Sequence, residues 1–384
     1  MDLAGVDDWQ PPPTHVPAPL VPEPLWASWN HQTVPLHTSS HEVRRPEALG
    51  ALAASWPIDA RTAGPCERFS WVSACSSTFA AGSLRAVALR RGARLAAIAP
   101  LESKIVDGVE HAAALGMELH EPTDLVYADL PALEGLVEAL LASGRPIVLG
   151  RVLQTSPTVQ AFRRLGPSRA AVFCRAAHPC PVIRLDGTWR EPESRLNAGR
   201  RSDLRRARRR AADRGQITFE IRTPSIEELE PLLVEAFAVE ARSWKGANGT
   251  ALSCDAERAS FFRRYARLAC QEGTLRMCNM RIDGLAVAMQ LAVECGGSFW
   301  LFKVGYDERF AQCAPGLLLM RETLAYAARS GLGTYELMGK IAPWTEVWTR
   351  EERRCVTLRI YPSNARGVAA LGRAAMRSVL QRWK

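Results

Sequence analysis

The sequence predicts an α/β fold of the α+β kind, built in two halves whose sheets are mixed and mostly antiparallel. One observation is a three-stranded meander over residues 274–307, TLRMCNMRIDG, LAVAMQLAVECGG and SFWLFKVGYD, with turns at Asp283-Gly284 and Gly296-Gly297. Such Gly-containing turns join antiparallel neighbours. A second observation is that helical and extended segments surround this meander without the regular strand–helix alternation of a doubly wound nucleotide-binding fold.

The first part of the chain divides into an aperiodic segment and an α/β half. Residues 1–45 are rich in Pro and His and predict a disordered lead-in. The half from 46 to 170 predicts strands at 84–89 and 95–104 with a turn near Gly92. An amphipathic helix at 130–144 and a buried strand at 145–152 follow.

The second half, from 181 to 350, repeats a similar order before the meander. The expected elements are a strand at 180–185, one or two helices over 191–215, a strand at 216–222, and helices at 225–244 and 257–273. Ser225 is expected to cap its helix with Glu228 at the capping-box position. After the meander come a helix opened by Pro315 and a strand at 333–339. Residues 351–384 predict a last strand and an amphipathic helix.

Composition sets limits on partners and location. The net charge of +9 permits a phosphorylated cofactor, a nucleic acid or an acidic membrane surface. The ten cysteines lack C-x-x-C spacing, and no Cys/His cluster suggests zinc, so no metal is expected. We expect free thiols in a reducing cytosol. An acidic, Pro-rich start is unlike a signal peptide. We expect a cytoplasmic protein. Peripheral contact with the inner membrane through the C-terminal helix is an open alternative.

The order of motifs from about 46 to 350 resembles a GNAT acyltransferase in tandem form. The second half carries the stronger likeness, in RRSDLRRARRRAADRG, ARSWKG, FFRRYARLAC, IDGLAVAMQLAV, FKVGYDERFAQCAPGLLLMRETL and GTYELMGK. The pattern is most similar to the CelD-type branch associated with cellulose and exopolysaccharide biosynthesis, and the architecture is similar to that of the Fem-type peptidoglycan transferases. The first half is expected to have a structural or acceptor-side role.

The resemblance implies an acyl-CoA co-substrate, such as acetyl-CoA, at the start of the helix opened by Pro315. In GNAT folds the preceding strand splays from its neighbour, and the loop and helix N-terminus face the pyrophosphate. The segment QCAPG stands where ordinary members have an Arg/Gln-x-x-Gly-x-Gly/Ala loop. Gly316 gives a ligand room, and the helix N-terminus favours an anion. The residues expected to bind the cofactor are Cys313, Pro315, Gly316, Leu317 and Leu318.

Three residues near the end of the strand are candidate catalytic groups. Acyl transfer needs a base for the acceptor's proton and an acid for the leaving thiolate, and Tyr306 and Asp307 offer both. Capping of the loop is the favoured alternative for Asp307. Simple alternation places Lys303 on the face of Phe299 and Leu301, where a charge needs a partner or a function.

Acceptor-side candidates lie on three segments. The resemblance places Trp244 and Lys245, at the end of a helix, and Lys340 and Trp344, after the last strand, near the acceptor. The helix around Arg205 and Arg208 carries eight arginines between residues 200 and 214. A solvated charged face is the simpler interpretation of these arginines, and phosphate binding is the functional one.

Together these features predict an acyltransferase that acts on an amine or hydroxyl of a saccharide-related acceptor. Polysaccharide synthase machinery is a further expected partner. Three alternatives stay open: a Fem-type transferase that uses aminoacyl-tRNA, a non-catalytic accessory protein of polysaccharide biosynthesis, and an RNA-binding module built on the arginine helix.

Overall fold

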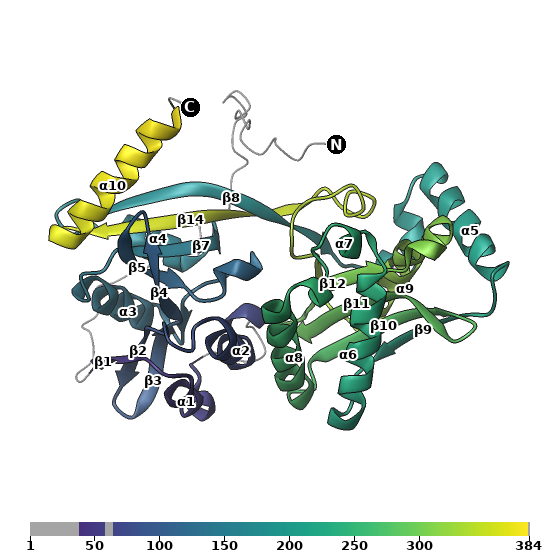
Figure 1. Cartoon of the computed structure of the whole chain (residues 1–384), viewed down its shortest axis with the longest axis horizontal. Coiled ribbons are helices and arrows are strands. Elements are labelled where there is room, and N and C mark those ends of the chain that lie inside the picture. The colour runs from purple at the N-terminus through teal and green to yellow at the C-terminus, as the bar shows by residue number, and fades with distance from the viewer. Residues whose placement is uncertain (1–37, 58–63, 383–384) are drawn as a thin grey trace. The chain divides into compact units, whose positions relative to one another are not determined.

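A computed structural model describes residues 38–57 and 64–382 (Figure 1). Most of the expected lead-in, residues 1–37, lies outside the described residues. Its last part is not irregular, because Thr38–Val43 forms strand β1 and pairs antiparallel with β2 (Ala86–Arg91). The predicted lead-in of 45 residues is therefore too long, because it includes β1.

The N-terminal half contains helices on both sides of its strands. Its further elements are α1 (Pro46–Gly50), η1 (Ala53–Ser55), η2 (Pro65–Glu67), α2 (Phe69–Phe79), β3 (Arg94–Ala99), β4 (Leu101–Val106), β5 (Val109–Ala114), η3 (Met117–Leu119), β6 (Val126–Tyr127), α3 (Leu130–Ala142), β7 (Ile147–Leu153), α4 (Pro157–Arg163) and β8 (Ala170–Arg184). The segment expected as one strand at 95–104 is two strands, since Pro100 lacks the N–H that a ladder needs.

The C-terminal half follows the order read from the sequence. Its elements are η4 (Gly187–Arg190), η5 (Pro192–Arg195), α5 (Ala198–Ala212), β9 (Ile217–Arg222), α6 (Ile226–Ala241), α7 (Trp244–Ala247), η6 (Leu252–Cys254), α8 (Ala256–Gln271), β10 (Leu275–Ile282), β11 (Leu285–Cys295), β12 (Ser298–Tyr306), η7 (Glu308–Cys313), α9 (Pro315–Arg329), β13 (Thr334–Glu336), β14 (Glu352–Pro362) and α10 (Ala365–Arg382). Ser225 caps α6 in the predicted capping box with Glu228.

Two sheets hold the described strands. A small sheet has the order β1-β2-β3-β6, and a ten-stranded sheet has the order β4-β5-β7-β14-β8-β13-β12-β11-β10-β9. The large sheet is mostly antiparallel, with parallel pairs only at β5–β7 and β12–β13 among the described strands. The predicted mixed, mostly antiparallel α/β fold is confirmed.

Strands β8 and β14 join the two halves into one sheet. Residues 170–181 of β8 pair with β14, and residues 182–184 pair with β13. Strand β14 in turn pairs with β7, so the segment after residue 350 completes the sheet of the N-terminal half. The boundary expected between residues 170 and 181 thus falls inside one continuous strand, which Figure 1 shows running between the halves.

Aromatic side chains fill the contact between α2 and α8. The Trp71 ring centre lies 4.9 Å from those of Phe261 and Tyr265, both edge-on, and 5.0 Å from that of Phe302, nearly stacked. Trp71 is almost fully buried. Aromatic pairs of this geometry add to the burial of apolar area, so α2 is packed firmly against the C-terminal half.

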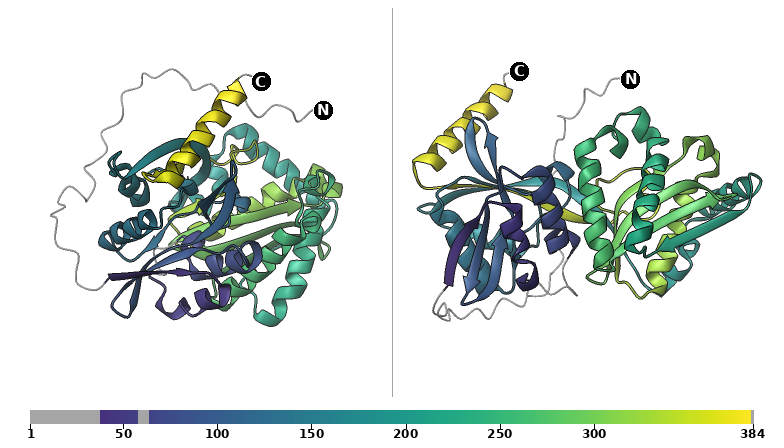
Figure 2. Two further views of the ribbon diagram at one scale, coloured as in Figure 1. Left: turned by 60° about the vertical axis from the view of Figure 1, so that its left-hand side comes forward. Right: turned by 60° about the horizontal axis from the view of Figure 1, so that its bottom comes forward.

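Helix α10 follows β14 and extends away from the strands of the N-terminal half (Figure 2). Arg373 donates to the carbonyl of Gly108, at 2.7 Å, and Arg377 pairs with Asp107, so the turn between β4 and β5 holds the basic side of the helix. Val368, Met376 and Val379 are each more than half exposed. Among the described residues no helix is long and apolar enough to cross a bilayer.

Candidate active site

Strand β12 separates from its neighbour β13 halfway along its length. The parallel pairing covers only Ser298, Phe299 and Trp300 of β12, which face Thr334 to Glu336. From Leu301 to Tyr306 that edge of β12 has no paired strand among the described residues. The pairing of the two strands thus ends where the expected splay requires it, ahead of the candidate residues Lys303 and Tyr306.

A β-bulge redirects the side chain of Lys303. Leu291 pairs with Lys303 while Ala292 pairs with Leu301, so Phe302 is an extra residue in β12. Simple alternation would put Lys303 beside Phe299 and Leu301, and that prediction is wrong. The bulge places Lys303 on the opposite face, toward α8, because an inserted residue reverses the alternation beyond it.

Lys303 lies beside an aromatic ring and near charged side chains of both signs. Its ammonium lies 4.6 Å from the centre of the Phe262 ring. Burial lowers the pKa of Lys303 to about 8, and nearby Lys245 and Arg258 act in the same direction, while Glu240 and Glu121 oppose them. No carboxylate in the described part of the chain forms an ion pair with it. Lys303 can therefore exchange a proton near neutral pH.

Lys245 is held in place behind β12. Its ammonium contacts the Val304 carbonyl at 2.6 Å and the Glu240 carboxylate at 2.9 Å. Glu240 is fully buried and also accepts from the Leu252 N–H at 3.0 Å. Lys245 thus fixes the splayed part of β12, and Glu240 is a site-supporting residue that sequence analysis missed.

Trp244 begins a helix rather than ending one. Helix α6 ends at Ala241, and Ser243 caps α7 by accepting from the Lys245 N–H at 3.2 Å. A side chain at Gly246 would lie 1.9 Å from the Ala241 carbonyl oxygen, so this turn requires glycine. Trp244 itself is 47% exposed, and its indole is accessible to a ligand.

Asp307 is a structural anchor at the end of β12. It is fully buried, pairs with Arg309 at 2.6 Å and Arg242 at 2.7 Å, and caps η7 through the Arg309 N–H. Hydrogen bonds from Arg309 and Arg242 outweigh burial and hold the pKa of Asp307 at about 2. A carboxylate that stays ionised and saturated is a poor proton acceptor near neutral pH, so the geometry favours the capping alternative.

The N-terminus of α9 lies beside Tyr306 on the other face of β12. Ala314 takes a left-handed φ of 43° and gives no side-chain cap, and Pro315 has no N–H. Leu317 and Leu318 donate to the Ala314 carbonyl at 3.0 and 3.2 Å, so Gly316 is the candidate donor of the first turn. A side chain at Gly316 would meet Tyr306 at 3.5 Å. Cys313 is buried in the core beneath.

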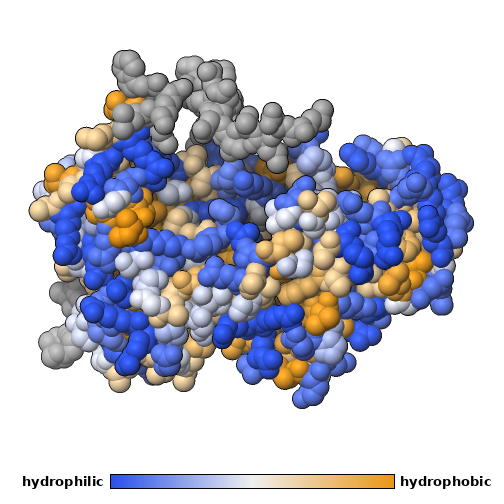
Figure 3. Space-filling model, in the orientation of Figure 1, coloured by the Kyte–Doolittle hydropathy of each residue, from blue (hydrophilic) through white to orange (hydrophobic). Residues whose placement is uncertain are grey.

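Arginines of α5 stand next to this helix start. Arg210 donates to the Gln312 carbonyl at 3.3 Å, and α5 packs against η7 and α9. Arg205, Arg208, Arg209 and Arg210 are exposed, and Figure 3 shows hydrophilic surface over α5. Cations beside an open helix N-terminus are suited to a phosphate-bearing ligand.

The side chain of Arg151 joins four chain segments that sequence analysis did not connect. Its guanidinium donates to the carbonyls of His120, His178, Pro179 and Gly339. Lys340 and Trp344 follow Gly339 and are both exposed. Neither Arg151 nor the two histidines lies in a recognisable motif, and only the folded chain brings them together.

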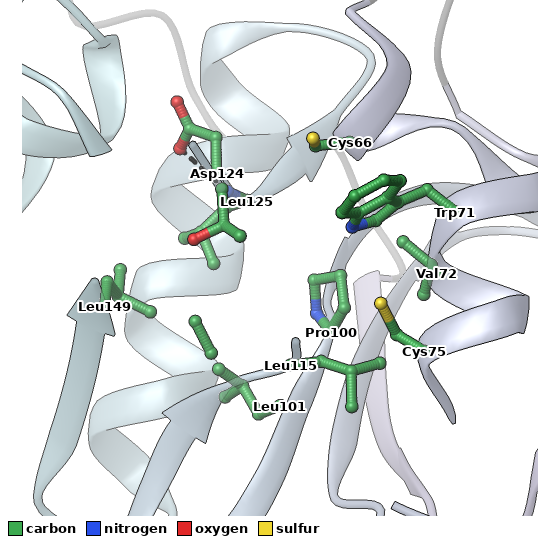
Figure 4. Close-up of a pocket in the computed structure, with 12 residues that line it drawn as sticks. Cys66, Trp71, Val72, Cys75, Pro100, Leu101, Leu115, Asp124, Leu125 and Leu149 are labelled. Atoms are coloured by element: carbon green, nitrogen blue, oxygen red, sulfur yellow. Dashed lines mark hydrogen bonds between the residues drawn. The ribbon is translucent and has the colours of Figure 1, made fainter. Parts of the chain in front are cut away.

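A small cavity lies within the N-terminal half (Figure 4). Trp71, Cys66, Cys75 and Asp124 line it, and its volume of about 10 Å³ suits a single water. Burial raises the pKa of Asp124, which accepts from Ser156 and from the Leu125 N–H. The cavity is too small for a substrate. In the described part of the chain no group of His, Cys, Asp and Glu could hold a metal ion.

The site lies in a region that matches a known family. Residues 198–346 match the model of the acetyltransferase (GNAT) domain. No curated protein matches the sequence. The matched part of the chain contains the splayed strand, the α9 N-terminus and the arginine helix, so it is similar to an acetyltransferase (GNAT) domain.

Solved structures share the fold across both halves. FemX is 13% identical with a TM-score of 0.53, over 85% of this chain and 98% of that one. A Bacteroides thetaiotaomicron protein of unknown function is 11% identical with a TM-score of 0.50, over 83% and 98%. A tandem GNAT protein from the clavulanic acid biosynthesis pathway is 14% identical with a TM-score of 0.43, over 85% and 99%. At these identities the likeness to the first two proteins shows a shared fold and nothing more.

Proposed function

We propose that this protein transfers an acyl group, preferably acetyl, from acyl-CoA to an amine or hydroxyl of a saccharide-related acceptor. One observation carries the proposal. The splayed half of β12 lies beside the uncapped N-terminus of α9, within the residues that match the GNAT domain. This combination offers backbone groups and an N-terminal helix dipole to an anionic donor.

The residues around α9 fit the donor. Only Tyr306 approaches the space that a side chain at Gly316 would fill, and it does so at an ordinary contact distance. The N–H of Gly316 would face the pyrophosphate, while the exposed arginines of α5 would pair with its phosphates. Pro315, Leu317 and Leu318 shape the helix start, and Cys313 supports it from the core.

Lys303 is the proposed proton carrier. A bound thioester supplies the activated acyl carbon. As the acceptor's N or O forms its bond to that carbon, Lys303 in its neutral form takes the proton from the acceptor. The bond from the acyl carbon to sulfur breaks, and the Lys303 ammonium returns the proton to the departing thiolate. A lysine with a pKa near 8 has both forms available for this cycle.

The acceptor side is proposed to include the exposed rings and cations near Lys303. Trp244 can stack on a sugar face, and Lys245 holds the strand that forms the floor. Lys340 and Trp344 lie on the exposed segment after β13. We place the protein in the CelD-type branch and in the cytoplasm, serving polysaccharide synthesis, with α10 as the element that would touch the inner membrane surface.

Calorimetric titration with acetyl-CoA and a longer acyl-CoA tests the donor site. Wild type should bind at least one of them, and Gly316→Val should bind at least about tenfold more weakly because its side chain would fill the ligand's space. Gly50→Ala is a control, since no described atom lies within 4 Å of the added carbon. Unchanged binding by Gly316→Val would move the donor site elsewhere.

The same titration separates the alternatives. If the wild-type protein binds neither acyl-CoA at millimolar concentration, transfer from a charged tRNA becomes the next assay, as the Fem-type alternative requires. If both assays fail, the accessory-protein interpretation replaces the enzymatic one.

A further inference from the structure

Arg151 is buried at the junction of four segments and is surrounded by carbonyl groups. Its Nε bonds the His178 carbonyl at 3.0 Å, and its terminal nitrogens bond the carbonyls of His120, Pro179 and Gly339. The nearest carboxylate, Glu121, is 3.8 Å away and accepts from the Gly339 N–H at 3.4 Å. Arg151 therefore positions main chain, and Glu121 is its carboxylate partner at the junction.

The backbone at this junction is in unusual conformations. His120, Arg151 and Met338 have left-handed φ values of 57°, 56° and 50°, and Gly339 has one of 48°. A non-glycine residue in this region costs free energy, and such residues gather where a site must hold a set geometry. Here they turn three separate segments toward one point.

Arg151, Arg258 and Lys340 bring positive charge to that point, and the imidazoles of His120 and His178 lie beside them. His120, His178 and Lys340 are exposed, and Arg258 reaches the same loop by donating to the Glu118 carbonyl at 2.9 Å. Partial burial is the main cause that lowers the pKa of His120. The nearby charges of Arg258, Lys340, Arg151 and His178 lower it further. Burial, Lys340 and Arg151 lower the pKa of His178 in the same way. Lys340 has no carboxylate partner within the described residues.

We infer that this cationic junction, made of His120, Arg151, His178, Arg258 and Lys340, binds an anionic group of the acceptor. The inference rests on the proposed acyl transfer, since it names the class of acceptor for that reaction. A phosphate or carboxylate would pair with Lys340 and Arg258 and accept hydrogen bonds from the two imidazoles. Glu121 lies 3.8 Å from Arg151 and Asp255 lies 3.3 Å from Arg258, so the net positive charge of the cluster comes from Lys340.

The junction is also placed to present an acceptor to Lys303. Lys303, Arg258 and Glu121 lie within electrostatic range of one another, as the causes of the lowered Lys303 pKa show. Both halves contribute, with His120, Arg151 and His178 from the first and Arg258, Lys303 and Lys340 from the second. This gives the first half a role on the acceptor side of the reaction.

Calorimetric titration of the full chain with three small probes tests the inference. Glucosamine 6-phosphate carries the phosphate, glucuronate carries a carboxylate, and glucosamine carries neither. We expect the phosphate or the carboxylate probe to bind at least about tenfold more tightly than glucosamine. The double variant Lys340→Gln with His178→Gln should reduce that preference to less than about threefold, while the exposed Arg163→Gln on α4 should leave it unchanged.

The outcomes distinguish this inference from the proposed function. Preference for glucosamine 6-phosphate alone identifies a phosphate-bearing acceptor, and preference for glucuronate alone identifies an acidic sugar. Equal binding of all three probes, or an unchanged preference in the double variant, overturns the inference. Acetyl-CoA titration of the same preparations reports the donor site separately, so loss of acetyl-CoA binding would count against the acyl transfer and not against the anion site.

Discussion

The ammonium of Lys303 lies 4.6 Å from the centre of the Phe262 ring, on the face of β12 to which the bulge at Phe302 turns it. This contact places a cation against an aromatic face instead of a carboxylate. Attraction to the ring favours the charged form, while burial favours the neutral one. Burial is the main cause that lowers the pKa of Lys303 to about 8, with Glu240, Lys245, Glu121 and Arg258 as the charged neighbours.

The pH dependence of acyl transfer should follow the deprotonation of Lys303. Because the neutral amine is the base, kcat/KM should rise with pH and level off above about pH 8. Lys303→Met should lower kcat by about 10²–10⁴-fold and remove this rise. Phe262→Leu should move the midpoint downward by about 0.5 pH unit, since the ring no longer favours the cation. Wild-type-like rates in Lys303→Met would exclude this residue as the base.

Replacing Lys303 should raise the stability of the fold although it lowers activity. Its folded pKa is depressed from 10.5 to about 8, so between these values the unfolded chain binds more protons and the free energy of unfolding rises with pH. At pH 7 the buried cation costs free energy. Lys303→Met should therefore stabilise the fold at pH 7 by about 1–3 kcal/mol, measured by urea unfolding. A destabilised Lys303→Met would show that the cation is better compensated than its contacts indicate.

Asp307→Asn should lower the free energy of unfolding. The substitution keeps the shape but leaves Arg242 and Arg309 beside a neutral amide, and we expect a loss of about 2–4 kcal/mol in unfolding free energy. The folded pKa of Asp307 is lowered to about 2, so its stabilising contribution is present above about pH 4 and is lost as pH falls toward 2.

Asp203→Asn is the matched control for this substitution. Its carboxylate is exposed and pairs with Arg206 along α5, so a change within about 0.5 kcal/mol is expected. Equal effects of the two substitutions would mean that burial of Asp307 does not matter.

Gly246→Ala should disturb the turn that positions Lys245. The added carbon would lie 1.9 Å from the Ala241 carbonyl oxygen, so backbone must shift. We expect a loss of about 1–3 kcal/mol in thermal or urea unfolding, together with a lower kcat. Gly50→Ala, which meets no described atom within 4 Å, should change stability by less than about 1 kcal/mol.

The arginines of α5 should control the salt dependence of donor binding. Replacing Arg205, Arg208 and Arg209 by Gln removes exposed cations from α5, the helix that packs against η7 and α9, so acetyl-CoA affinity should fall and depend less on added salt. The melting temperature should change little, because these side chains are exposed. Unchanged affinity would make α5 a solvated charged face.

Local sequence signals predicted most of the helices and strands. Ser225 and Glu228 mark the start of α6, Pro315 marks the start of α9, and Gly284 and Gly297 adopt the positive φ that their hairpin turns need. These features depend on a few neighbouring residues, and they can therefore be recognised without the fold.

Features that depend on distant contacts could not be predicted. Nothing in SFWLFKVGY reveals that Phe302 is bulged, and one extra residue is enough to reverse the face of Lys303. The association of His120, Arg151, His178 and Lys340 depends on segments more than 200 residues apart. The sequence favours capping for Asp307 but does not reveal that Arg242, from another helix end, binds it.

Strand β14 has a consequence for the order in which this protein can mature. It lies between β7 and β8 in the sheet, yet a ribosome makes it only after the elements from β9 to β13. While the chain is being synthesised, β7 and much of β8 present unsatisfied edges, and such edges invite pairing with other chains. Nascent chains stalled before residue 352 should therefore need chaperone protection, and the first half should reach its native state only after β14 has been made.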